Sequence, residues 1–454
     1  MEFDRVKFLV KIFFNGYRYA RRTYSSRENL RAVENEALRR AIHIAYHETD
    51  FYRERFDRAG IKPGDIRTIE DLSLIPITTK KDLADNFAAL IPRSMDKNRS
   101  YLLRTSGSTG NPIQVYKDEG WVTHVVASAI RLIKMHTTVF PKTALILDSK
   151  SRGAYEKHSV NFYKYIGARI SIISVQQDIE KIMTDLEICR PDYIVTYTGV
   201  MRELARLRKA GRGRQLRLRK VALTGEILDD FTRAYIEDAF DCLCYSTYIS
   251  TEGGPMASEC VNKKLHANID ANTLEIVDSQ GQPVKKGEDG FVVMTCHDGG
   301  HGTPVIRYSG CADMSRWTDE TCDCGYQTPI LSSIRGRADD AIHLPDGRVC
   351  HAFNMTIPME KIQRGNQGEL IRQYQIVQHD FDRIDISLVR NADAHELPED
   401  LLHQIGRVYQ EQLGPLVNIS VKEVPSISRS SSSVARAPLV LSRIAREKLS
   451  QMNV

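Results

Sequence analysis

The sequence predicts an α/β protein of two domains, in which helices cover the sheets of a large N-terminal domain and a smaller α+β domain follows. The chain has 454 residues, which is more than one typical domain holds. From about Val115 to Leu228, short apolar runs alternate with helical stretches, as in buried parallel strands joined by helices. After Gly336, a turn-rich segment and one long helical stretch indicate a second unit. We place the boundary within Ile334–Asp339, which gives domains of residues 1–335 and 336–454.

The N-terminal part is expected to be helical. Ser25 and Glu28 have the spacing of a capping box, and apolar residues from Leu30 to Ala45 recur at helical spacing. We take this helix as the first element of the chain. A turn-rich passage follows it, and a second, short capped helix is predicted near Ile69–Leu72.

Four apolar runs in the central region predict parallel strands, with the helices Ile179–Glu187 and Met201–Lys209 between them. From Leu274 to Thr295 the pattern changes to strand and turn. Further on, Pro345-Asp346-Gly347 is typical of a hairpin turn, and Glu399–Leu413 reads as one long helix. The four runs are Ala144–Leu147, Ile170–Ile173, Tyr193–Val195 and Val221–Leu223.

Composition excludes several classes of protein. The 63 basic and 58 acidic residues give a net charge of +5, and the basic residues are dispersed, so we expect no nucleic-acid partner. No apolar run reaches the roughly 18 residues of a membrane span, and Lys7, Lys11 and Arg18 interrupt the apolar residues near the N-terminus. Nine cysteines, an odd number, do not form a secreted disulfide framework. We therefore predict a cytoplasmic protein, and a homodimer is the assembly that we consider.

One loop has the composition of a phosphate-binding site. Thr105-Ser106-Gly107-Ser108-Thr109-Gly110 follows a short apolar stretch. Glycines let the backbone approach a polyphosphate, successive N–H groups form an anion-binding concavity, and hydroxyls donate hydrogen bonds. The Gly-Lys pair of a Walker loop is absent. On its own such a loop is more often a flexible connector, so its meaning depends on the rest of the chain.

That loop, continued by Asn111-Pro112, resembles the phosphate loop of the adenylate-forming superfamily of acyl-CoA synthetases and peptide-synthetase adenylation domains. Tyr248–Glu252 resembles the family's aromatic-Gly-x-Thr-Glu motif. Pro304–Tyr308 with Asp313 resembles its ribose-binding segment, and Gly336–Asp340 resembles its interdomain hinge. The passage from Ala45 to Lys80, which ends in Pro76-Ile77-Thr78-Thr79-Lys80, looks like phenylacetate-CoA ligase and its relatives, the capsule-biosynthesis protein CapK and coenzyme F390 synthetase. The resemblance covers about residues 30–445.

The resemblance implies roles for single residues in binding ATP. Thr251 should contact the α-phosphate, and Glu252 should help to hold Mg²⁺, whose charge compensates the charge that builds when a carboxylate attacks. Asp313 should accept hydrogen bonds from the ribose, with Arg337 near the ribose and phosphate and Tyr248 stacked near the adenine. Asp339 should be the pivot on which the C-terminal domain moves. The β- and γ-phosphates should be cradled by Thr105, Ser106, Gly107, Ser108, Thr109 and Gly110.

Three departures from the family pattern bear on function. Ile249 replaces the usual glycine, and its branched side chain restricts the backbone and fills space beside the nucleotide. The segment from Tyr308 to Asp313 is one residue longer than usual. The family's C-terminal catalytic lysine is missing, because no lysine lies between Lys422 and Lys448. Alignment of the chain's end puts Arg436 at that position, where it either replaces the lysine as a catalytic cation or is a solvated surface residue.

A zinc site is also predicted. Seven of the nine cysteines fall between Cys242 and Cys324, and Cys260, His266, Cys322 and Cys324 supply a ligand set suited to tetrahedral Zn²⁺. The resemblance implies that these stretches meet beside the active-site motif. Four protein ligands leave no open position, so the zinc would be structural. Buried thiols with a hydrogen-bonded histidine are the alternative, and Cys311 is a competing ligand.

We therefore expect an AMP-producing, adenylate-forming ligase that uses ATP and Mg²⁺ to activate a carboxylic acid, expected to be aromatic, and transfers it to CoA or another thiol such as a carrier protein. The alternatives are adenylation with an amine acceptor or transfer of AMP itself, and a non-catalytic nucleotide-binding homologue. The acid pocket should lie near three segments that precede the nucleotide motifs, with Tyr197 and Tyr245 flanking an aromatic ring. The segments are Tyr197–Val200, Thr224–Glu226 and Tyr245–Tyr248.

Overall fold

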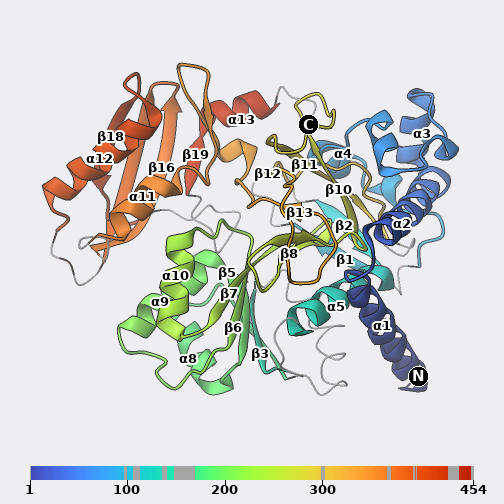
Figure 1. Cartoon of the computed structure of the whole chain (residues 1–454), viewed down its shortest axis with the longest axis horizontal. Helices are drawn as coiled ribbons and strands as arrows, with labels where there is room; N and C mark the ends of the chain where they lie inside the picture. Colours follow the sequence, from blue (N-terminus) through green and yellow to red (C-terminus); the bar gives the residue numbers. More distant parts are fainter. Residues whose placement is uncertain are drawn as a thin grey trace.

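The computed structural model describes residues 2–96, 100–105, 113–134, 141–147, 169–297, 302–365, 370–391, 394, 396–427 and 439–450. Its largest sheet has eight strands in the order β13-β9-β8-β7-β6-β5-β3-β4. This sheet, the helices around it and a second, four-stranded sheet give the mixed α/β architecture that the sequence predicts (Figure 1).

The parallel half of the large sheet confirms the four predicted strands, which pair in parallel together with β7. The consecutive residues Val221, Ala222 and Leu223 are all buried, as expected of a strand that is covered on both faces. The covering helices are α8 (Ile179–Cys189), α9 (Thr198–Lys209) and α10 (Asp230–Phe240). The strands are β3 (Thr143–Leu147), β4 (Ile170–Ser174), β5 (Tyr193–Tyr197), β6 (Lys220–Thr224) and β7 (Leu243–Ser250).

Antiparallel strands continue the large sheet and form two smaller ones. In the large sheet, β8 (Gly254–Glu259), β9 (Leu265–Ala267) and β13 (Ile330–Leu331) follow β7. A separate sheet contains β10 (Asn272–Val277), β11 (Gly290–Cys296) and β12 (Met314–Ser315), which confirms the expected strands and turn. A hairpin joins β1 (Tyr101–Arg104) to β2 (Gln114–Lys117), and α5 (Glu119–Lys134) follows it.

The N-terminal helices differ from the prediction at two points. Helix α1 (Glu2–Arg22) precedes the helix that we took as the first element, which is α2 (Arg27–Glu48). The N-cap of α2 is Ser26, which accepts from the backbone of Asn29, rather than Ser25. The predicted short helix is present as η2 (Ile69–Leu74). The other elements are α3 (Asp50–Arg58), η1 (Pro63–Asp65), α4 (Lys80–Asp85) and η3 (Ala88–Leu90).

The C-terminal elements form a body beside the large sheet, coloured orange to red in Figure 1. After η6 (Ala338–Asp340), the predicted hairpin is present as β14 (Ile342–His343) and β15 (Val349–Cys350). The predicted long helix is α12 (Glu399–Leu413), which buries one residue per turn at Leu401, Ile405, Tyr409 and Leu413. The other elements are α11 (Thr356–Gln363), β16 (Ile371–Asp380), β17 (Arg383–Arg390), β18 (Asn418–Glu423), β19 (Val440–Ser442) and α13 (Arg443–Ser450).

Within the described residues, no helix is both long enough and apolar enough to cross a bilayer.

Candidate functional site

The candidate site lies where parallel strands of the large sheet end. In open α/β sheets, ligands bind beyond the carboxyl ends of the strands. Strand β7 ends at Ser250, so Thr251 and Glu252 come directly after it, and Thr224 ends the neighbouring strand β6. Thr251 is half-buried and Glu252 is buried. The Thr-Glu motif therefore occupies the edge at which a nucleotide site is expected.

The phosphate loop is held at its base by the β1–β2 hairpin. The backbone N–H of Thr105 donates to the carbonyl of Ile113 at 3.0 Å, and the Thr105 hydroxyl accepts from the Ile113 N–H at 2.9 Å. Strand β2 is tied to the predicted ribose segment, because Tyr116 and Thr303 exchange hydrogen bonds of 2.8 and 2.9 Å. Ser106–Gly110 lie outside the described residues, so their predicted phosphate contacts stay a prediction.

Glu252 is oriented by Tyr308, a residue to which the sequence had assigned no separate role. The Tyr308 hydroxyl donates to Glu252 Oε1 at 3.1 Å, and burial, then the Glu252 carboxylate, raises the pKa of Tyr308 well above its ordinary value. The hydroxyl therefore stays protonated as a donor. The Tyr308 backbone is fixed by two hydrogen bonds to Met294 in β11, of 2.8 and 3.0 Å. One carboxylate oxygen is thus held by the protein.

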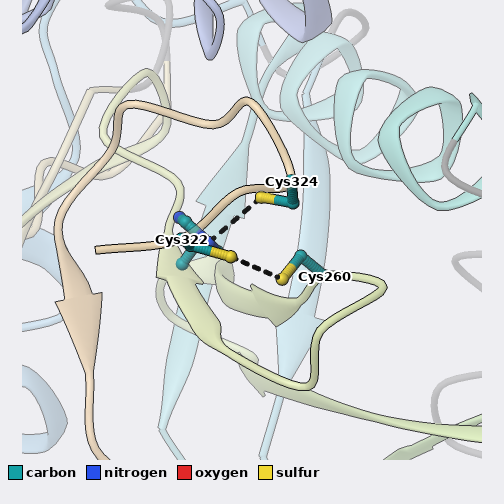
Figure 2. A group of neighbouring side chains, drawn as sticks. Cys260, Cys322 and Cys324 are labelled. Atoms are coloured by element: carbon teal, nitrogen blue, oxygen red, sulfur yellow. Dashed lines mark hydrogen bonds between the residues drawn. The ribbon is translucent and has the colours of Figure 1, made fainter. Parts of the chain in front are cut away.

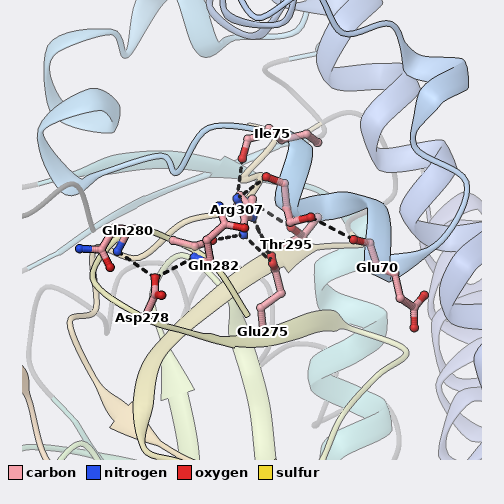
Figure 3. Close-up of polar contacts among 10 residues, drawn as sticks. Glu70, Ile75, Glu275, Asp278, Gln280, Gln282, Thr295 and Arg307 are labelled. Atoms are coloured by element: carbon pink, nitrogen blue, oxygen red, sulfur yellow. Dashed lines mark hydrogen bonds and ion pairs between the residues drawn. The ribbon is translucent and has the colours of Figure 1, made fainter. Parts of the chain in front are cut away.

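The side chain of Arg307, the residue before Tyr308, lies among the Glu275 carboxylate and backbone carbonyls (Figure 3). Its guanidinium makes three hydrogen bonds of 2.9–3.2 Å with the Glu275 carboxylate on β10. It also donates to the carbonyls of Ile75 and Gly281, both at 2.6 Å. The Arg307 side chain is only 2% exposed, so it serves as an internal brace between the segment before α4 and the sheet of β10 and β11.

The two predicted residues for the nucleoside contact each other. The Tyr248 hydroxyl donates to Asp313 Oδ2 at 2.9 Å, and burial raises the pKa of Tyr248 well above its ordinary value, with a further contribution from Asp313. Tyr248 is buried in the largest apolar cluster. Its neighbour Ile249, which replaces the family's glycine, is instead 42% exposed.

Arg337, Asp339 and Lys80 form a charged group beside Glu252. Arg337 Nε donates to Asp339 Oδ1 at 2.9 Å, and Arg337 pairs with Asp313 through an isolated β-bridge. Burial would lower the pKa of Arg337, but the carboxylates of Asp339 and Asp313 outweigh it and raise that pKa. Burial, then Arg337, lowers the pKa of Lys80, while Glu252 and Asp339 oppose the shift.

Backbone pairing explains why Lys80 lies there. Thr78 bonds to both sides of Tyr308: its N–H donates to the carbonyl of Arg307 at 2.9 Å, and its carbonyl accepts from Ser309 at 3.1 Å. Thr79 then caps α4, whose first residue is Lys80. The sequence motif contained Lys80, but no spacing rule linked it to Glu252, 172 residues later.

The four predicted zinc ligands meet in one cluster. The ligand atoms of Cys260, His266, Cys322 and Cys324 all lie within 4.8 Å of one another. Cys260 Sγ and Cys322 Sγ are 3.5 Å apart, as are Cys324 Sγ and His266 Nε2 (Figure 2). A tetrahedral zinc with Zn–S bonds of about 2.3 Å needs ligand atoms roughly 3.5–3.8 Å apart. The donor chemistry and these two 3.5 Å separations therefore fit zinc.

Neighbouring groups orient these ligands. His266 Nδ1 lies 3.3 Å from both the carbonyl and the hydroxyl oxygen of Thr328, which leaves Nε2 facing the sulfurs. The Tyr326 N–H points at Cys324 Sγ at 3.4 Å, and Asn262 Nδ2 lies 3.5 Å from Cys322 Sγ. Cys311, the competing ligand, is absent from the metal-binding groups found among the described residues, and burial, then the charges of Glu252 and Asp313, raises the pKa of its thiol well above the ordinary value.

The segments expected to line the acid pocket are adjacent at the sheet edge. Glu226 Oε2 accepts from the N–H of Gly199 at 2.5 Å, which ties the end of β6 to the start of α9. The Tyr245 ring is covered by Lys263, whose Nζ lies 3.9 Å from the ring centroid. Tyr245 is thus engaged by a cation, while Tyr197 is half-buried at the end of β5. Arg436 lies outside the described residues.

No protein-family model matches the chain. It is 26% identical to the phenylacetate-coenzyme A ligase of Thermus thermophilus over 336 residues, which cover 70% of this chain and 72% of the relative. It is 22% identical to protein CapK of Staphylococcus aureus, with 84% of each chain covered. Among solved structures, 2-hydroxyisobutyryl-CoA ligase in the postadenylation state, in complex with 2-HIB-AMP, has the same fold, with a TM-score of 0.76 at 17% identity and coverage of 94% and 93%. These likenesses support the superfamily of adenylate-forming ligases and, within it, the branch of phenylacetate-CoA ligase and CapK.

Proposed function

We propose that the protein uses ATP to convert a carboxylic acid into an acyl-AMP and then transfers the acyl group to the thiol of CoA. The observation that carries the proposal is the charged group of Glu252, Asp313, Arg337 and Lys80. In the first step, a carboxylate oxygen of the acid attacks the α-phosphorus of ATP and pyrophosphate leaves. In the second, the thiol sulfur attacks the acyl carbon and AMP leaves.

In this proposal the residues divide the work of binding. Asp313, held by Tyr248, accepts from the ribose hydroxyls, and Arg337 lies beside ribose and phosphate. The loop Thr105–Gly110 cradles the β- and γ-phosphates, and Thr251 contacts the α-phosphate. Glu252 holds Mg²⁺, because a carboxylate fixed by Tyr308 is the hard oxygen ligand that this ion prefers. Bound Mg²⁺ would supply positive charge to the phosphates.

Lys80 is our candidate for the positive charge that the missing C-terminal lysine would supply. It is the first residue of α4 and is half-buried, and its pKa is lowered by burial and Arg337 while the charges of Glu252 and Asp339 oppose the shift. We expect Lys80→Met to reduce acid-dependent exchange of pyrophosphate into ATP by at least about 100-fold. The matched control is Lys81→Met, because Lys81 is exposed and pairs with Asp85. If Lys80→Met exchanges normally and Arg436→Met does not, the catalytic cation is Arg436.

We propose an aromatic acid as the substrate, supported by the relative named phenylacetate-coenzyme A ligase. The direct test is exchange of labelled pyrophosphate into ATP with a panel of aryl and short aliphatic acids, with and without Mg²⁺. Exchange with an aryl acid, followed by AMP release that depends on CoA, is expected. Acyl transfer to amines, or release of an adenylylated product without CoA, would replace the thiol step. ATP binding without exchange for any acid would indicate a non-catalytic homologue.

The Cys260/His266/Cys322/Cys324 cluster would hold one structural Zn²⁺. The ion would pin the turn after β8 to the 318–326 turn, because two ligands come from each side. Elemental analysis of the purified protein is expected to give one zinc per chain. A metal-free sample with normal folding and exchange would contradict the zinc.

We further propose that the two domains meet at residues 335 and 336, with Asp339 as the pivot. The support is the position of η6 between the two main bodies, where Ala338 N–H donates to the carbonyl of Ala312 at 2.6 Å. Asp339→Pro is expected to slow thioester formation while exchange persists, since it stiffens the backbone at the pivot. Equal loss of both steps would argue against a pivot.

A further inference from the structure

Helix α1 packs against the rest of the protein, including α5, through one narrow face. Ile12 and Ala20 are each only 1% exposed, and Gly16 lies between them on the same side. A Cβ at Gly16 would sit 2.7 Å from Val126 of α5, so glycine permits the close approach of the two helices. In Figure 1, the N-terminal end of α1 extends away from the rest of the molecule.

The C-terminal end of α1 is fixed by buried polar contacts. Arg131 of α5 donates to the carbonyl of Tyr19 at 3.1 Å and to Asp270 at 2.5 Å. The Tyr19 ring stacks on His124 at 5.3 Å, and the carbonyl of Thr23 accepts from Gln327 at 2.8 Å. The rotation of α1 about its own axis is therefore set, and its outer face always points away from the protein.

That outer face is apolar. Val10, Phe13, Phe14 and Tyr17 have the spacing of one helical stripe, and they are 62%, 39%, 65% and 38% exposed. They make up four of the fourteen large apolar side chains that are exposed among the described residues, in a single helix. A contiguous exposed apolar stripe marks a site of contact, whereas scattered exposed apolar residues are ordinary.

Positive charge flanks the stripe. Lys11, Arg18 and Arg21 are exposed, and the sequence holds no acidic residue between Asp4 and Glu28. Lys11 pairs with Glu119 of α5, but its side chain remains 57% exposed. A helix with large apolar residues on one side and basic residues beside them is suited to the interface of an anionic bilayer.

We propose that α1 attaches the protein to the surface of an anionic lipid bilayer, with the stripe of Val10, Phe13, Phe14 and Tyr17 inserted among the lipids. The charge argues against a second copy of the chain as the occupant, because pairing two such helices would bring their basic residues together with no acid in this stretch to match them. The proposal concerns peripheral binding, so it agrees with the predicted cytoplasmic location and does not depend on the proposed reaction.

The test is flotation of the full-length protein with phosphatidylcholine vesicles that contain phosphatidylglycerol, compared with pure phosphatidylcholine. We expect binding to the anionic vesicles only, weakened by salt. Phe13→Ser with Phe14→Ser should reduce the partition coefficient about 100-fold, because each large apolar side chain contributes roughly tenfold or more. Arg18→Gln with Arg21→Gln should reduce it about 30-fold.

Matched controls distinguish vesicle binding by α1 from non-specific binding through other exposed apolar or basic residues. Ile188→Ser with Leu416→Ser removes two isolated, highly exposed apolar residues and should leave binding unchanged. Arg214→Gln, Arg217→Gln and Arg219→Gln together remove three exposed arginines of another segment and should have little effect. All variants should melt at the wild-type temperature, because every altered side chain is exposed.

Three results would overturn the proposal. One is the absence of flotation with anionic vesicles, and another is an equal loss of binding in the arginine control. The third is a concentration-dependent dimer that Phe14→Ser abolishes, since the stripe would then be a self-association surface. Phe14→Trp provides a direct reading, because its fluorescence should shift to the blue on anionic vesicles and be quenched by brominated lipid.

Discussion

Replacing Arg307 by methionine should destabilise the large domain without first affecting nucleotide binding. The guanidinium is 2% exposed and satisfies the Glu275 carboxylate together with the carbonyls of Ile75 and Gly281. Removing one partner of a buried ion pair costs about 3–5 kcal/mol, because the other charge stays buried without compensation. This loss is a large share of the roughly 5–15 kcal/mol that stabilises a typical domain.

Urea unfolding, followed by circular dichroism and tryptophan fluorescence, measures this cost. The double variant Arg307→Met with Glu275→Leu should recover about 2 kcal/mol relative to Arg307→Met, because no carboxylate is then left unpaired. Arg372→Met is the matched control, since Arg372 also pairs with a glutamate, Glu203, but is 40% exposed. It should cost less than about 1 kcal/mol.

The reasoning would be refuted if Arg307→Met unfolded at the wild-type urea concentration and yet bound ATP poorly. Arg307, which lies in the segment that resembles the ribose-binding motif, would then act on the ribose rather than as the internal brace. A cost in unfolding free energy no greater than that of Arg372→Met would also refute the role of Arg307 as an internal brace.

Three further predictions address the site and its surroundings. Tyr308→Phe should lower pyrophosphate exchange about tenfold at unchanged melting temperature, because a hydrogen bond to a charged group is lost from Glu252; unaltered exchange would contradict the positioning role. Burial raises the pKa of Glu34 from 4.5 to about 7, so its contribution to stability is complete below pH 4.5 and is lost as the pH rises through 7. Glu34→Gln should therefore be more stable than wild type by up to about 3 kcal/mol at about pH 8 and similar to it at about pH 4, as measured by urea unfolding; an equal gain at both pH values would exclude titration of Glu34. Cys322→Ser should lose the bound zinc and lower the melting temperature by several degrees, and full zinc content in this variant would show that the metal lies elsewhere.

The strands and helices that could be predicted are those in which burial follows a regular pattern along the sequence. Strands β3 and β6 each bury three consecutive residues, which requires continuous apolar runs, and such runs are visible in the sequence. Helix α12 buries one residue per turn and was predicted with its observed bounds. Helix α1 was missed because its buried face needs only small contacts at Ile12, Gly16 and Ala20, while large apolar residues lie on its exposed side. Apolar residues therefore lie on two sides of α1, so its sequence does not show the one apolar face that is typical of a surface helix.

The sequence predicted single residues of the candidate site, but it did not predict which of these residues contact one another. The family motifs predicted Glu252, Asp313 and Arg337 as site residues, and the four Cys and His side chains lie together as the resemblance implied. No sequence rule distinguishes Arg307 from Tyr308 as the partner of Glu252, because Arg307 has a left-handed backbone conformation, with φ at 50°, and only the fold shows where each side chain points. The contact of Lys80 depends likewise on pairing between Thr78 and the segment at Tyr308, more than 200 residues away.

These contacts give a physical role to the end of the passage from Ala45 to Lys80, whose sequence pointed to the phenylacetate-CoA ligase branch of the superfamily. Residues 73–80 provide carbonyls for Arg307 through Ser73 and Ile75, backbone pairing for Tyr308 through Thr78, and the cation Lys80. Residues 73–80 therefore hold the side chain of Arg307, position Tyr308 and add a positive charge beside Glu252. A displacement here would move both the carboxylate proposed to hold the metal ion and the cation proposed to contact the phosphates. Changes in this segment should consequently alter stability and exchange together, whereas changes at Asp313 should affect nucleotide affinity first.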